Sequence, residues 1–325
     1  MRGVRAISRA KKERIRRGNL FVPLIFSFGA KLEDLPVDVF LNDPTKLSNS
    51  LRTIQNYFQV DGVVCYGDDT VLAEILGKMD PASLMSTPAP TSKKRFEELE
   101  SRIVGIAEKG RVATALEVAK RLNILLPDTI IMGVVPGPVK LASQLTGLSS
   151  GDLISEQDLL VQTTKATLTF ARALGETGID MLMVREDALP PIDSKSLRLL
   201  TRCYSPLWNT AKYYGFYAFL MPGELLTENV APLKKIVDGI IFPAGTDPET
   251  WQKFKKISFS LPVSLLEKEQ DEIESFLSEG GILDALNSSR LLLVTTDKEV
   301  PETVHKEYMI RGIRVVRDFL NKDLN

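Results

Sequence analysis

Short apolar segments rich in β-branched residues alternate with helix-length amphipathic segments along the whole chain, and this alternation constrains the fold more than any other feature. Strands that alternate with helices indicate βαβ units and a parallel sheet. Eight segments have the length and composition of strands: Phe21–Phe28, Gly62–Tyr66, Thr129–Val135, Asp180–Val184, Phe216–Met221, Asp238–Phe242, Phe259–Leu265 and Leu291–Thr295. Eight such units predict an α/β fold of the closed (β/α)8 or TIM barrel type, whose chemistry sits on the loops after the carboxyl ends of the strands.

The segments between these strands have the apolar spacing of helices. They are Pro44–Phe58, Ser92–Leu122, Ser155–Gly178, Ser194–Tyr214, Glu224–Lys235, Asp247–Lys256, Gln270–Glu279 and Val304–Leu320. The segment Ser92–Leu122 is long enough for one helix or two. At 325 residues the chain has the length of a single barrel domain, which we predict to span residues 1–325.

Two segments fall outside the repeating βα pattern. Residues 1–19 are rich in Arg and Lys and lack the apolar run of a secretory signal. We expect them to form a solvated first helix that either closes the bottom of the barrel or steers an anionic partner, with a mitochondrial-type presequence as the alternative. Residues 80–94, rich in Pro, Ser and Thr, follow the second predicted strand and form either a lid or a linker.

Composition narrows the class of protein further. Hydrophobic residues make up 44% and charged residues 26%, with a net charge of −1, so no overall nucleic-acid or membrane surface is expected. No apolar run reaches the length of a membrane span. Cys65 and Cys203 have no metal-ligand spacing, so we expect reduced thiols in a cytoplasmic protein.

Acidic residues gather where the second and fourth predicted strands end, at Asp68, Asp69, Glu186 and Asp187. Crowded carboxylates shift one another's pKa, which suits general acid/base catalysis or recognition of a cation. The alternative is that each caps the helix that follows. We predict Asp68 and Glu186 as the catalytic residues. Arg185, beside Glu186, would either pair internally or bind a substrate carboxylate.

Residues at the other predicted strand ends complete the candidate site. The predicted substrate-binding set is Ser27, Phe28, Tyr66, Asp69, Gln144, Arg185, Asp187, Met221, Phe242 and Thr296. Its aromatic members and Met221 would form either an apolar wall around a substrate or ordinary packing at the barrel top. The single histidine, His305, falls in the last predicted helix, so we predict it at the surface and no histidine metal site. The sequence has no glycine-rich phosphate motif, which disfavours phosphosugar chemistry.

Three stretches carry a resemblance to a known family: Asp61–Gly77 (DGVVCYGDDTVLAEILG), Gly133–Gly147 (GVVPGPVKLASQLTG) and Gly175–Asp187 (GETGIDMLMVRED). In this order they resemble the uroporphyrinogen decarboxylase superfamily, which includes corrinoid-dependent methyltransferases. The resemblance runs nearly the full length and implies a single (β/α)8 barrel. It also implies that Asp68, nine residues before Gly77, matches the decarboxylases' essential aspartate.

Most other functional positions of the decarboxylases depart from that pattern. Their arginines after strand one are absent from FSFGAKLED, which holds Ser27 and Phe28 instead. Gln144 stands at their tyrosine, Arg185 lies near their serine, and TTD at 295–297 replaces their histidine. Each missing arginine removes charge-assisted hydrogen bonds worth roughly 1.5–3 kcal/mol, which argues against uroporphyrinogen as the substrate.

The zinc ligands of the superfamily's methyltransferases are also missing. Their His-x-Cys motif would fall on Leu220 and Pro222, and their later cysteine near Thr296, so no zinc is expected. The resemblance therefore implies a zinc-independent methyltransferase that acts with a corrinoid (cobalamin) protein, with Glu186 or Asp68 protonating or orienting the leaving atom. No tightly bound cofactor is expected, and the family implies a homodimer.

Two other functions stay open at this point. The first is a decarboxylase of uroporphyrinogen or another carboxylated substrate, with Asp68 at its centre. The second is a barrel that has lost its catalytic residues and binds a ligand without turnover, since arginines, tyrosine, histidine and zinc ligands are missing together.

Overall fold

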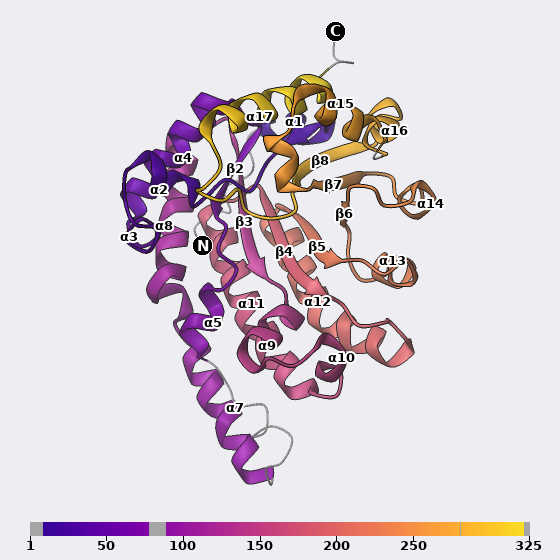
Figure 1. Cartoon of the computed structure of the whole chain (residues 1–325). Coiled ribbons are helices and arrows are strands. Elements are labelled where there is room, and N and C mark those ends of the chain that lie inside the picture. The colour runs from indigo at the N-terminus through magenta and orange to yellow at the C-terminus, as the bar shows by residue number, and fades with distance from the viewer. Residues whose placement is uncertain (1–8, 78–88, 280, 322–325) are drawn as a thin grey trace.

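A computed structural model describes residues 9–77, 89–279 and 281–321 and shows a parallel α/β barrel, which confirms the predicted fold class (Figure 1). Its strands are β1 (Leu20–Phe21), β2 (Gly62–Tyr66), β3 (Ile130–Pro136), β4 (Met181–Ala188), β5 (Tyr217–Glu224), β6 (Ile241–Pro243), β7 (Ile257–Leu261) and β8 (Leu291–Thr296). They pair in parallel in two runs, β2-β3-β4-β5 and β1-β8-β7-β6.

Narrow junctions join the two runs into a barrel. A single parallel bridge between Leu220 and Ile240 connects β5 to the β6 side. At the other junction the Asp61 N–H donates to the Phe21 carbonyl at 3.0 Å, and the Phe21 N–H donates to the Asp61 carboxylate at 2.8 Å. These contacts close the ring between the two runs, although among the described residues no strand ladder joins β1 to β2 or β5 to β6.

Helices surround the strands (Figure 1). They are α1 (Arg9–Arg17), α2 (Phe28–Leu32), α3 (Val37–Asn42), α4 (Pro44–Phe58), α5 (Val71–Leu76), α7 (Ala89–Ile103), α8 (Gly110–Leu125), α9 (Pro138–Thr146), α10 (Ser150–Leu153), α11 (Gln157–Thr177), α12 (Ser194–Tyr214), α13 (Thr227–Leu233), α14 (Pro248–Trp251), α15 (Gln270–Glu279), α16 (Ile282–Asn287) and α17 (Lys306–Leu320), with short 3-10 turns at Ile106–Glu108 and Val263–Glu267.

Local sequence signals explain several of these boundaries. Asp43 caps α4 by accepting from the N–H groups of Thr45 and Lys46, and Pro44 occupies the first helical position. Asp193 caps α12 in the same way, and α11 ends at Gly178 in the left-handed conformation. The bounds of α4 and α12 match their predicted ranges, because apolar spacing and capping both depend on residues that are neighbours in the chain.

Three predicted elements were wrong in extent, and the segment predicted as one helix or two holds two. The first strand ends at Phe21 rather than Phe28, because Pro23 has no N–H to donate to a sheet and the chain then turns into α2. The seventh strand ends at Leu261, immediately before Pro262. The segment Ser92–Leu122 holds two helices, divided at Gly105, whose φ is +67°. The helix expected over Asp247–Lys256 is only the four residues of α14.

The N-terminal helix α1 closes the bottom of the barrel. Ile15 is 1% exposed and belongs to the cluster of side chains that fills the barrel interior. Lys11 is buried, and its Nζ lies 2.7 Å from Asp180 Oδ2 at the start of β4. The helix is therefore packed through Lys11 and Ile15 rather than fully solvated. Of the proposed lid, residues 80–88 lie outside the described residues, and residues 89–94 form the beginning of α7.

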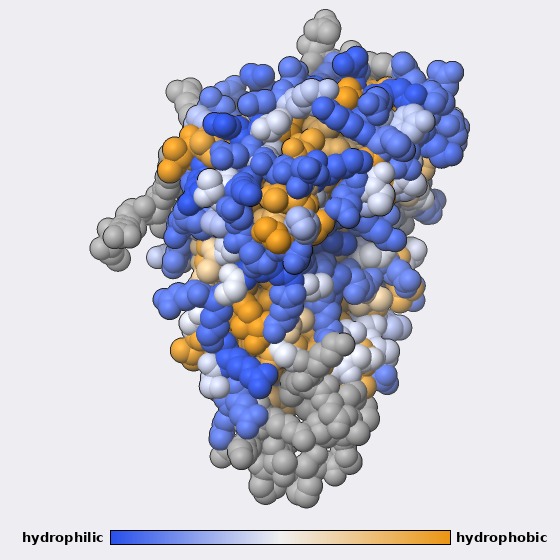
Figure 2. Space-filling model, turned by 60° about the vertical axis from the view of Figure 1, so that its left-hand side comes forward, coloured by the Kyte–Doolittle hydropathy of each residue, from blue (hydrophilic) through white to orange (hydrophobic). Residues whose placement is uncertain are grey.

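Side chains of alternating strand residues fill the barrel interior, as the period of two in a strand requires. This interior set comprises Ile15, Leu20, Val22, Leu24, Val64, Ile130, Met132, Val134, Met181, Met183, Phe219, Met221, Ile241, Leu292 and Leu293. The other strand residues pack outward against the helices. Figure 2 shows a mostly hydrophilic outer surface with separate apolar patches. In the part of the chain that the structure describes, no helix is both long and apolar enough to cross a membrane.

Candidate functional site at the barrel mouth

A network of ionised side chains lies where the strands β2, β3 and β4 end. Asp69, in the loop after β2, has its Oδ2 3.0 Å from Lys140 Nζ and 3.2 Å from an Arg185 guanidinium nitrogen. Lys140, in the first turn of α9, also pairs with Asp187 at the end of β4. The structure thus brings together Asp69, Arg185 and Asp187 of the predicted set, and adds Lys140 to them.

Arg185 extends across the mouth. It lies on the same face of β4 as Met183, whose side chain fills the barrel interior. From there one nitrogen reaches Asp69 near β2, and another lies 3.4 Å from the Asp297 carbonyl, in the loop after β8. The guanidinium has five N–H donors, and these two contacts are long, so Arg185 has the capacity to bind a carboxylate bidentately.

Asp68 lies beside a cation that the sequence argument missed. Its carboxylate pairs with Arg111 at the start of α8 and accepts from the Thr70 N–H at 2.8 Å. Arg111 also donates to Glu74 of α5, with Nε 2.9 Å from the carboxylate. Arg111 comes from a helix rather than a strand end, and no local signal in the sequence points to it.

Glu186 faces away from this network. It is 2% exposed, and its carboxylate accepts the N–H groups of Val139 at 3.2 Å and Lys140 at 2.5 Å, as well as the Tyr204 hydroxyl of α12. Burial raises the pKa of Glu186 to about 7, while the hydrogen bonds from Tyr204, Lys140 and Val139 act in the opposite direction. Glu186 therefore caps α9, the helix that follows β3, whereas the alternative expected was that it caps the helix after its own strand.

A further acidic residue, Glu299, belongs to the mouth and was also missed. It lies in the loop after β8 and accepts the backbone N–H of Ser27, a predicted site residue. Burial raises the pKa of Glu299, and the nearby Asp68 raises it further, whereas Arg185 lowers it. Its position shortly after the eighth strand is a signal that sequence analysis could have used.

Gln144 lies on α9, one turn after Lys140. Its Nε2 is 3.3 Å from the Asp69 carbonyl, so it joins the same corner of the mouth. Its Oε1 is buried and has no hydrogen-bond partner among the described residues. Gln144 therefore holds an unused acceptor near Asp69.

Three predicted aromatic site residues pack elsewhere. Phe28 lies in α2 and is fully buried in the outer core. Tyr66 donates its hydroxyl to the Leu41 carbonyl at 3.2 Å, and its ring lies 4.7 Å from that of Phe26. Phe242 belongs to the outer core between strands and helices. These side chains correspond to the packing alternative rather than to an apolar wall of the mouth.

The remaining two predicted residues, Met221 and Thr296, lie in different surroundings. Met221 faces the barrel interior and lies beside Arg185, its register partner on the neighbouring strand. Thr296 is fully buried, and its Oγ1 accepts the Leu24 N–H at 3.0 Å, a contact that joins β8 to the segment after β1.

The two thiols and the imidazole lie outside the mouth. Cys65 is buried on β2, where desolvation raises its pKa to about 12, and burial also raises the pKa of Cys203 on α12. His305 is exposed immediately before α17, as predicted. Within the described ranges, no three His, Cys, Asp or Glu residues are arranged to hold a metal ion.

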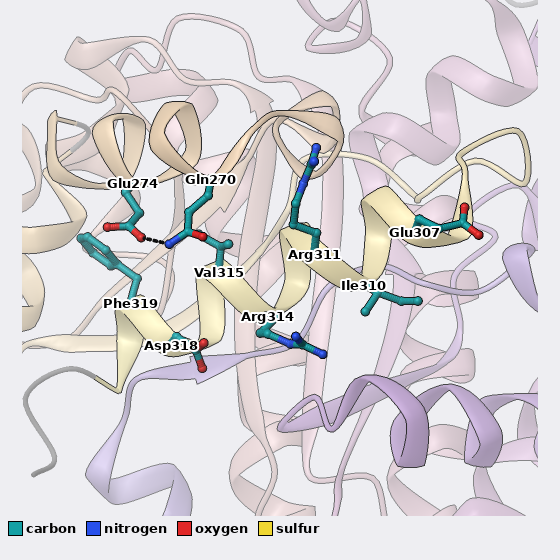
Figure 3. Close-up of a pocket in the computed structure, with 9 residues that line it drawn as sticks. All are labelled: Gln270, Glu274, Glu307, Ile310, Arg311, Arg314, Val315, Asp318 and Phe319. Atoms are coloured by element: carbon teal, nitrogen blue, oxygen red, sulfur yellow. Dashed lines mark hydrogen bonds between the residues drawn. The ribbon is translucent and has the colours of Figure 1, made fainter.

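Among the hollows lined by the described residues, two lie between helices that surround the barrel. One, of about 360 Å³, lies between α15 and α17. Figure 3 shows Gln270 and Glu274 of α15 facing Val315 and Phe319 of α17, with Gln270 donating to Glu274 at 2.7 Å. The other, of about 620 Å³, lies between α3, α5 and α8 and is bordered by Arg111. The second adjoins the mouth through Arg111, which pairs with Asp68.

No protein-family model matches the chain, and no curated protein matches it. Among solved structures, a methyltransferase from Methanosarcina mazei is similar with a TM-score of 0.68, 16% identity, and coverage of 93% of this chain and 92% of that one. A B12-independent methionine synthase from Shewanella sp. W3-18-1 has a TM-score of 0.48 at 13% identity, over 64% of this chain and 67% of that one. At such identity the first likeness shows the fold alone. The chain is thus a (β/α)8 barrel with an ionic network in its mouth.

Proposed function

We propose that this barrel is a methyltransferase-type enzyme whose small-molecule substrate carries a carboxylate, with Arg185 as the carboxylate-binding group. The observation that supports this is the position of Arg185 across the mouth, held at its edges by Asp69 and the Asp297 carbonyl. The shape shared with a methyltransferase over both whole chains supports the reaction class, as does the resemblance to the uroporphyrinogen decarboxylase superfamily.

The mouth offers groups for each part of such a reaction. Met221, beside Arg185 on the neighbouring strand, supplies an apolar surface against which a methyl group can lie. When methyl leaves a donor heteroatom, the electron pair stays on that atom, which then takes a proton. Glu299 suits this step because burial favours its protonated form. Asp68 suits orientation of the donor because Arg111 and the Thr70 N–H hold its carboxylate in place.

The methyl acceptor in this proposal is a corrinoid, whose cobalt accepts methyl groups. The donors in the mouth are carboxylates, an ammonium and a guanidinium, which do not include the imidazole or thiolate that would ligate cobalt or zinc. A corrinoid would therefore be held by a partner protein, while this chain binds and orients the substrate.

An anaerobic absorbance experiment with methylcobalamin tests the proposal in the reverse direction. The protein is mixed with methylcobalamin and one of two thiols, 3-mercaptopropionate or 1-propanethiol, which differ in the carboxylate. We expect cob(I)alamin to form faster with the carboxylated thiol. Arg185→Gln should abolish that preference, whereas Arg202→Gln, at an exposed site on α12, should keep it. Equal rates with both thiols, or no methyl transfer, would contradict the proposal.

One observation favours decarboxylation as a second candidate. Arg111 contacts Asp68, the residue that matches the decarboxylases' aspartate, so cations at Arg111, Lys140 and Arg185 surround the acids of the mouth. These cations could hold more than one substrate carboxylate. Anaerobic conversion of uroporphyrinogen to coproporphyrinogen, lost in Asp68→Asn, would support this function. Binding of the tetrapyrrole without conversion or methyl transfer would instead favour a non-catalytic barrel.

A further inference from the structure

We propose that Glu186 is a positioning residue: its buried carboxylate fixes the first turn of α9 and so holds the Lys140 ammonium between Asp69 and Asp187. Glu186 faces the helices α9 and α12 outside the strands, and this arrangement links it to the ionic network of the mouth. The importance of this link for catalysis rests on the proposed function. The geometry of the link and the experiment that tests it do not depend on that function.

The carboxylate of Glu186 occupies a site that is built around it. One oxygen accepts from the Val139 N–H and the Tyr204 hydroxyl, and the other from the Lys140 N–H. These N–H groups belong to the first turn of α9, where a helix favours negative charge. A side chain at Gly137 would overlap this carboxylate, so glycine is required there for Glu186 to reach the helix.

Lys140 transmits this contact to the mouth, because its two ends have different partners. Its backbone N–H is bound by Glu186, while its Nζ lies between the carboxylates of Asp69, at 3.0 Å, and Asp187. Asp69 in turn contacts Arg185. Displacement of the first turn of α9 would therefore move Lys140 and leave Asp69 with one cation instead of two.

The protonation of Glu186 provides a test of this link near neutral pH. The groups that face it are Tyr204 and Cys203 from α12 and Lys140 from α9, and its pKa is raised to about 7 by burial. A protonated carboxyl loses its charge and part of its capacity to accept hydrogen bonds. The first turn of α9 is then held less tightly, and the Lys140 ammonium becomes more accessible.

Amine acetylation of the full-length protein, without any substrate, measures this accessibility. The initial rate at Lys140 is divided by the rate at Lys165, an exposed lysine of α11 that pairs with Glu100, to cancel the pH dependence of the reagent. In the wild type we expect this ratio to rise several-fold as the pH falls from about 8 to about 6, because Glu186 titrates in that range. A ratio that does not change would overturn the proposal.

Three variants separate positioning from a merely structural role. Glu186→Gln should keep the ratio at its high, low-pH value throughout. Tyr204→Phe removes a hydrogen bond that lowers the pKa of Glu186, so the midpoint should move to higher pH. Tyr213→Phe, at an exposed tyrosine of the same helix, should leave the midpoint unchanged. If Glu186→Gln fails to fold, an unmoved midpoint in Tyr204→Phe would by itself contradict the proposal.

Discussion

Arg185 and Asp69 lie 3.2 Å apart across the mouth of the barrel, although Arg185 lies within β4 and Asp69 follows β2. Asp69 also holds Lys140, so a single buried carboxylate is shared between two cations. Asp187 also pairs with Lys140, so the two cations and two carboxylates balance in charge, and Arg185 keeps N–H donors for an anionic group. Four predictions follow from the contacts that hold this mouth and the barrel beneath it.

Replacement of Lys11 by Met should destabilise the protein strongly. Lys11 and Asp180 form an ion pair in which both side chains are buried, so the variant removes an ion pair and its hydrogen bond from the interior. We expect the free energy of unfolding to fall by about 3–5 kcal/mol in urea denaturation. Lys12→Met, at an exposed neighbour in α1, is the matched control and should change it by less than about 0.5 kcal/mol. A loss of similar size in both variants would show that α1 does not close the barrel through this pair.

Two arginines of α8 should differ in their effect on stability. Arg111 is 16% exposed and pairs with Asp68 and Glu74, whereas Arg121 is 35% exposed and pairs with Glu117. Arg111→Met should therefore cost about 1–3 kcal/mol, since it leaves Asp68 partly buried and unpaired. Arg121→Met should cost about 0.5 kcal/mol or less. Thermal and chemical denaturation of both variants would test this order, and a larger loss for Arg121→Met would reverse it.

The stability of the protein should depend on pH through Glu186. Its pKa is raised in the folded state from 4.5 to about 7, so the folded protein holds a proton that the unfolded chain releases. The corresponding stabilisation is present below about pH 4.5 and is lost as the pH rises towards 7. Its size is of the order of 3 kcal/mol.

Comparison of Glu186→Gln with the wild type isolates this contribution. The difference in their free energies of unfolding, measured from about pH 4.5 to about pH 8, should follow the titration of the buried carboxyl. Glu299, whose pKa is also raised, contributes with the same sign to both proteins and should cancel. A difference that stays constant across this range would mean that Glu186 does not titrate there.

Substitution of Gly137 by Ala should displace Glu186 from the start of α9. An added Cβ would overlap the carboxylate, which has no free space to move into. We expect a loss of about 1–3 kcal/mol in the free energy of unfolding, together with a higher Lys140 acetylation ratio. Gly151→Ala, in the exposed α10, serves as the control because its added Cβ meets no atom closer than 3.8 Å. Unchanged stability in Gly137→Ala would contradict the close approach.

Much of the fold could be predicted from the chain because it depends on local patterns. The apolar runs of β2, β3 and β4 and the capped helices α4 and α12 matched their predicted positions closely. The first and seventh strands were predicted too long, since apolar residues continue past Pro23 and Pro262 after the sheet has ended. Apolar composition does not distinguish a strand from a buried turn or short helix.

The candidate site was predictable in part. Asp69, Arg185 and Asp187 were predicted to share a site because barrel topology brings the carboxyl ends of strands together, and the structure places them in one ionic network. The catalytic interpretation of Glu186 required its side chain to face the mouth. Because Arg185 faces inward and successive strand residues alternate, Glu186 instead points outward, towards α9 and α12. Arg111 came from a helix, and no pattern in the sequence predicted its contact with Asp68.

The sequence by itself determined the class of fold, the order of its strands and helices, and the acidic character of the strand ends. These properties depend on hydrophobic period, capping and composition, which are local. Only the tertiary structure decided which acids meet which cations: Asp69 with Lys140 and Arg185, Asp68 with Arg111, and Glu186 with the start of α9. Such pairs join segments far apart in the chain, and their geometry depends on strand register and helix packing, which no short stretch of sequence encodes.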